Sequence, residues 1–153
     1  MDARLQALLN PSFAKDPPVK LNISAKTLGG IYAVLGAIAA VLGLVGVLGL
    51  LGVGSYLAYV GVGGLIFLVA LGNLISVSGT GMAAWGGYRM YQEDHDGKRV
   101  VIYGLALSVV GGFVAALGTF GGGILGWIIS LAITFVLYYL VIISRFDNET
   151  KLV

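Results

Sequence analysis

Two long stretches of the chain, positions 27–88 and 100–144, contain no charged residue and no histidine. Both consist mainly of Leu, Val, Ile, Ala and Gly. A helix that crosses a bilayer needs about 20 apolar residues, because the hydrocarbon core is roughly 30 Å thick and each residue rises about 1.5 Å. Each stretch is long enough for two crossings, so the sequence predicts four transmembrane helices.

Glycine-rich segments and charges set the limits of these spans. The predicted spans are residues 28–51, 65–85, 100–120 and 124–144, joined by a glycine-rich turn at 52–64, a charged loop at 89–99 and a short glycine turn. The pattern leaves open whether 52–64 is a loop or part of a longer, tilted second helix. Apolar runs do not alternate with polar residues as barrel strands would. The fold class is therefore an all-α integral membrane protein with four helices as two hairpins.

The predicted four-helix domain, residues 28–146, is flanked by a polar arm at 1–27 and a tail at 147–153. The first nine residues place apolar side chains on one helical face. This pattern predicts either a short amphipathic helix on the membrane surface or a frayed end. Three prolines follow within residues 10–21 and predict an extended tether.

All lysines and arginines fall on one side of this predicted topology. They are Arg4, Lys15, Lys20, Lys26, Arg89, Lys98, Arg99, Arg145 and Lys151. Positive residues accumulate in cytoplasmic loops, so we expect both termini and the 89–99 loop to be cytoplasmic. The plan of residues 28–146, with Trp85-Gly86-Gly87-Tyr88-Arg89 at the exit of a span, resembles that of many small four-span bacterial membrane proteins. This resemblance implies a bacterial or archaeal cytoplasmic membrane and no particular activity.

Composition agrees with a membrane protein and narrows its chemistry. Charged residues make up 10% of the chain, against about 25% in soluble domains. There is no cysteine, which excludes disulfides, thiolate metal sites and thiol catalysis. No predicted span contains an ionisable acid or base, which argues against proton-coupled transport, haem ligation and catalysis within the membrane. A net charge of +2 gives no reason to expect nucleic acid binding.

Small residues recur four apart in three of the spans. These ladders are Gly72, Ser76, Thr80 and Ala84; Gly104, Ser108, Gly112 and Ala116; and Gly126, Ser130 and Thr134. Small faces let helices approach closely in lipid, where the hydrophobic effect does not drive association. We interpret them as the interior of the bundle, with faces for partner helices as the alternative. Leu105 lies off this face, so the ladder predicts that a larger side chain is tolerated there.

Asn73 is the most polar side chain predicted at membrane depth. Its amide could contact a ligand or ion, or form an inter-helix hydrogen bond worth about 0.6 to 2 kcal/mol. We favour the hydrogen bond, with Thr134 and Tyr138 as possible partners.

The charged loop contains the one weak candidate for a metal site. Its metal-capable side chains are Glu93, Asp94, His95 and Asp96. Their oxygens could hold a divalent ion, but the spacing matches neither an EF-hand nor a zinc motif. We expect a solvated turn and no metal or other cofactor.

The function predicted from these patterns is a non-catalytic accessory, assembly or scaffold component that packs against itself or a larger membrane complex. An alternative is an oligomeric channel or small facilitator whose uncharged polar path is lined by residues such as Asn73, Ser76 and Thr80. A third possibility is a lipid- or pigment-binding protein that uses its tyrosines and Trp127.

Overall fold

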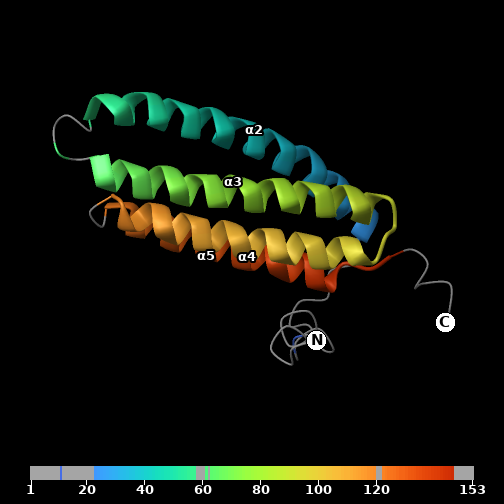
Figure 1. Ribbon diagram of the computed structural model, residues 1–153. Helices are drawn as coiled ribbons and strands as arrows, with labels where there is room; N and C mark the ends of the chain where they lie inside the picture. The colour runs from blue at the N-terminus through green and yellow to red at the C-terminus, as the bar shows by residue number, and fades with distance from the viewer. Residues whose placement is uncertain (1–10, 12–22, 58–60, 62, 120–121, 147–153) are drawn as a thin grey trace.

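The computed structural model describes residues 11, 23–57, 61, 63–119 and 122–146 (Figure 1). The predicted amphipathic helix at residues 1–9, most of the predicted tether and the tail at 147–153 lie outside the described residues.

The described part of the chain is helical. Its elements are α2 (Ala25–Leu57), α3 (Gly63–Tyr91), α4 (Asp96–Leu117) and α5 (Gly122–Ile143). Each of the four is long and apolar enough to cross a membrane, which confirms for the described residues the prediction of four helices of that length and composition. The 33 residues of α2 and the 29 of α3 correspond to about 50 and 44 Å of helix at 1.5 Å per residue. Both are therefore longer than the predicted spans.

Most of the glycine-rich segment 52–64 is helical. Residues 52–57 continue α2, and α3 already begins at Gly63. Backbone N–H and C=O groups find no water inside a bilayer, so hydrogen bonding within a helix outweighs the low helix propensity of glycine. Between the two helices, Gly61 has a φ of 81°, a left-handed conformation that suits glycine in a turn.

The charged connection is also shorter than the predicted loop, because Arg89–Tyr91 belong to α3 and Asp96 begins α4. The Asp94 N–H donates to Arg89 O and the Glu93 N–H donates to Met90 O, each at 3.0 Å. This is the hydrogen-bond pattern of a Schellman motif. Glu93 has a φ of 64° at the position where such motifs usually have glycine.

Figure 1 shows α3 between α2 and α4, with α5 beside α4. α3 packs extensively against both neighbours, whereas α5 packs less extensively against α4. We compare the buried share of the most apolar stretch of each helix. It is 33% for α4 and 17% for α3, but only 11% for α5 and 6% for α2. The described ends of the chain, near residues 23 and 146, lie at the same end of the bundle as the charged connection.

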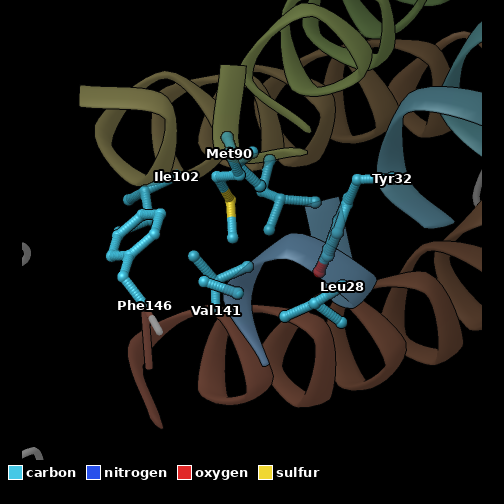
Figure 2. Close-up of a cluster of buried hydrophobic side chains, with 9 residues drawn as sticks. Leu28, Tyr32, Met90, Ile102, Val141 and Phe146 are labelled. Atoms are coloured by element: carbon cyan, nitrogen blue, oxygen red, sulfur yellow. The ribbon is translucent and has the colours of Figure 1, made fainter. Parts of the chain in front are cut away.

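A buried apolar cluster lies at this charged end (Figure 2). It combines Leu28 and Tyr32 of α2, Met90 of α3, Ile102 of α4, Val141 of α5 and Phe146, together with Ala25, Val101 and Leu105. Leu105 is only 8% exposed. Leu105 is thus buried within this cluster, so its surroundings give no support to the prediction that a larger side chain is tolerated there.

Candidate functional site

Glycines spaced seven residues apart bring the backbones of α3 and α4 together. They are Gly72, Gly79 and Gly86 on α3, and Gly97, Gly104 and Gly111 on α4, with Gly118 directly after α4. A Cβ added at Gly79 would lie 2.5 Å from the Ser108 nitrogen, and one at Gly104 would lie 2.5 Å from the Ala83 nitrogen. Real Cβ atoms do not approach so closely, so only glycine fits. A seven-residue repeat is typical of a left-handed helix pair.

The predicted four-residue ladders cross this interface obliquely. Residues 72, 76 and 80 of α3 lie near α4, but Ala84 faces Gly36 of α2. A step of four residues turns a helix by about 400°, so the ladder drifts by about 40° per step, whereas seven residues drift by only about 20°. The same drift takes α4 from Gly104, which faces α3, to Gly112, which faces Trp127 of α5. The seven-residue glycine spacing is visible in the sequence and is the better signal.

Hydroxyl groups link α3 and α4 at the centre of the interface. The Ser108 Oγ lies 3.2 Å from Ser76 O and 3.0 Å from Gly104 O, and can donate to either. The Thr80 hydroxyl donates to Ser76 O at 2.8 Å and lies 3.5 Å from the Ser108 Oγ. These hydroxyls therefore bond to backbone carbonyls in a tightly packed contact.

α2 uses a similar spacing against the opposite side of α3. Gly29, Gly36 and Gly43 each face α3, and a Cβ at Gly29 would lie 2.6 Å from Gly87 O. A Cβ at Gly43 would meet the flexible Val77 side chain at 2.5 Å. The closest backbone contact between α2 and α3 is thus at the charged end.

We call the half of a helix that is farther from the charged connection its far half. Trp127 anchors the far half of α5 to α4. Its Nε1–H donates to Val109 O at 3.1 Å, and its ring centroid lies 5.2 Å from that of Phe113. Gly112 leaves room for the indole, since a Cβ there would lie 3.2 Å from Trp127 Cδ1. Nearby, the Thr119 Oγ1 accepts from the Gly123 N–H at 2.9 Å, and Gly123 packs against Ala116.

The predicted ladder on α5 lies mostly on the exposed surface. Gly126 and Ser130 are exposed, and a Cβ at Gly126 would meet no atom of the described residues within 4 Å. Thr134 donates to Ser130 O of its own helix at 2.8 Å. Among the described residues, no other helix therefore covers this face at Gly126.

Asn73 is half-buried on α3. Its amide makes no hydrogen bond to the residues that the structure describes, and the Thr134 hydroxyl bonds within α5. The predicted bond from Asn73 to Thr134 is therefore not formed here.

Each acidic side chain of the charged connection lies near a basic side chain. The Arg89 Nη2 lies 2.6 Å from Asp94 Oδ2, and the Arg89 Nε donates to the same oxygen at 2.7 Å. Lys26 lies 3.6 Å from Glu93. Asp96 lies 3.4 Å from Arg99 and 4.0 Å from Arg89. The His95 ring lies against Phe146, with centroids 4.3 Å apart.

The acidic side chains thus pair with basic residues, and Asp94 and Asp96 share Arg89. Among the described residues, no group of three or more acidic, histidine or cysteine side chains converges on a common point. The arrangement ties the connection to α2, α3, α4 and the end of α5, which is more structure than a solvated turn provides.

The Asp94 carboxylate stabilises this connection in a pH-dependent way. The Asp96 N–H, which donates to Asp94 Oδ1 at 2.9 Å, and then Arg89 hold the pKa of Asp94 below its ordinary value of 3.8. A group with a lowered pKa contributes stability above its unfolded-state pKa and loses it as the pH falls through the folded-state pKa.

Asp94→Asn should therefore lower the thermal unfolding temperature at neutral pH, and the difference from wild type should shrink as the pH falls below about 3.8. Asp96→Asn is the matched control, because its exposed ion pair contributes only about 0 to 1 kcal/mol. Equal effects of the two substitutions across this pH range would contradict the assigned role of Asp94.

Comparisons of the chain with protein-family models, curated protein sequences and solved structures give no match. Its function must be inferred from the helix faces and the charged end themselves.

Proposed function

We propose that this chain is a non-catalytic scaffold or accessory component of a membrane, which packs against its own copies or against a larger membrane complex. The exposed small-residue face of α5 carries the proposal. Gly126 and Ser130 lie on that face, and close approach of another helix is what small residues permit in lipid. The contact between α3 and α4 relies on the same residue types.

The arrangement of the polar side chains favours a scaffold over a channel. Thr80 and Ser108 direct their hydroxyls to the backbone carbonyls of Ser76 and Gly104, where two helix backbones touch. Ser130 lies on the exposed side of α5. These groups do not share one path within a single chain, so a pore would require several copies.

Reconstitution in liposomes tests this choice. We expect ion and small-solute flux no higher than in protein-free liposomes. Flux that depends on the protein and is abolished by Asn73→Leu would support the channel and contradict the scaffold. Asn73→Gln, which keeps the amide, is the matched control.

We also propose that the two hairpins are inserted with both termini and the charged connection in the cytoplasm, as the distribution of lysine and arginine indicates. Cysteines introduced at Ser55 and Gly122 should then react with an impermeant thiol reagent added outside intact cells. A cysteine at His95 should react only after the membrane is opened. Reaction of position 95 with reagent added outside would show that the orientation is the opposite of the proposed one.

A further inference from the structure

The first and last described segments of the helical domain lie side by side. The Ala25 N–H donates to Arg145 O at 2.7 Å, and the Arg145 N–H donates to Ile23 O at 3.0 Å. Ser24 and Arg145 form a parallel bridge. The first N–H groups of a helix have no partner within it, so Arg145 satisfies the first residue of α2. We call residues 23–25 and 144–146 the terminal strap.

The charged connection holds the C-terminal half of the strap in place. Phe146 is 2% exposed, and its ring contacts both the His95 ring and the Lys98 ammonium, which is 5.0 Å from the Phe146 ring centroid. The Lys98 Nζ also donates to Ser144 O. A cation at the end of α5 is favourable, because unpaired carbonyls give a helix C-terminus partial negative charge.

Contacts next to the strap also join α2 to α5. The Tyr32 hydroxyl donates to Leu137 O at 2.9 Å. Figure 2 shows Leu28 and Tyr32 of α2 directed toward the same cluster as Val141 and Phe146. Lys26 adds an ion pair to Glu93 in the connection. A hydrogen bond and apolar contacts therefore join α2 to α5 at the charged end, and the ion pair joins α2 to the connection.

Away from the strap the two helices diverge. Figure 1 shows the far ends of α2 and α5 apart, with α3 drawn between them. The far half of α2 is largely exposed, with Leu48 at 63% and Val53 at 59%. The interface between α3 and α4 has its own glycine contacts from Gly72 to Gly118 and does not depend on the strap.

We propose that the terminal strap is a conformational latch. When closed it fixes the separation of α2 and α5, and when open it lets the far half of α2 move away from α5 while α3 and α4 stay paired. Because the strap consists of the segments that lead directly into residues 1–22 and 147–153, an event at either end of the chain can act on the position of α2.

A disulfide across the strap tests whether it closes in a bilayer. The chain has no cysteine, so Ser24→Cys with Arg145→Cys gives a unique pair. Paired backbones lie about 4.8 Å apart, within the separation of about 4.4 to 6.8 Å that a disulfide can span. We expect the full-length protein in nanodiscs to form this disulfide readily.

Phe146→Ala should slow its formation, because a destabilisation of about 1.4 kcal/mol raises the ratio of open to closed strap tenfold. Phe113→Ala is the control, because Phe113 lies against Trp127, away from the strap. Failure of the starting pair to cross-link, or equal slowing by both substitutions, would overturn the proposal.

Spin labels at Val53 and Leu125, both exposed in the far halves of α2 and α5, test the consequence of opening. We expect one narrow distance distribution in the otherwise unmodified protein and an added longer distance with Phe146→Ala. Oxidising the strap disulfide before labelling should restore the narrow distribution. If Phe146→Ala does not fold, Lys98→Met, which removes only the ammonium group, replaces it. If the distances between the two spin labels are unchanged by Phe146→Ala or Lys98→Met, the strap is not a latch.

Discussion

Gly79→Ala should lower the free energy of unfolding by about 1 to 3 kcal/mol, the usual cost of overpacking a well-packed interface. The added Cβ would lie 2.5 Å from the Ser108 nitrogen and 2.6 Å from Gly104 O. Both are backbone atoms, so relief requires that α3 and α4 move apart. The measurement is thermal unfolding in a mild detergent, followed by circular dichroism.

Gly81→Ala is the matched control on the same helix. A Cβ at Gly81 meets no atom of the described residues within 4 Å, so this substitution should leave stability unchanged or raise it slightly, because alanine has the higher helix propensity. Equal destabilisation by both substitutions would mean that the close contact between α3 and α4 is wrongly assigned.

Trp127→Ala should release the far half of α5 from α4. The substitution removes the hydrogen bond to Val109 O and the ring contact with Phe113. An inter-helix hydrogen bond in lipid contributes about 0.6 to 2 kcal/mol, so we expect a loss of at least this size in unfolding free energy, because the packing of the indole is lost with it.

Trp127→Phe separates the two contributions, since it keeps an aromatic ring beside Gly112 but removes the donor. We expect its loss of stability to fall between those of wild type and Trp127→Ala. If both variants unfold like wild type, Trp127 does not anchor α5.

The number of membrane-spanning helices could be predicted from the sequence because bilayer thickness sets a minimum apolar length and charges interrupt it. Helix ends could not be predicted as well. The segment 52–64 is rich in glycine, which indicates a turn in water, but backbone groups in lipid require hydrogen bonds within a helix. As a result α2 continues to Leu57 and α3 begins at Gly63.

The sequence could predict that small residues form the contacts between helices, but not which small residues face which helix. A four-residue ladder includes Ala84 and Gly112, which face α2 and α5, and omits Gly79 and Gly111. The seven-residue spacing of glycines, which keeps nearly the same direction over two turns, identifies the contact between α3 and α4 more accurately.

The strap has no comparable signal in the sequence. Phe146 directly follows Arg145 in a segment that looks like the start of a polar tail, and Lys98 is one of several charged residues in a loop. Their roles depend on contacts between positions about fifty residues apart, such as Lys98 with Ser144, which periodicity cannot reveal.

Native mass spectrometry of the full-length protein, extracted from membranes in polymer-bounded nanodiscs, tests the proposed scaffold most directly. The account predicts an assembly of several copies, or of this chain with a fixed partner, that dissociates in Gly126→Leu but persists in Gly81→Leu. The two substitutions are alike in size, and neither meets a described residue of the same chain at the Cβ position. A single copy bound only to lipid, for wild type as for both variants, would contradict the account.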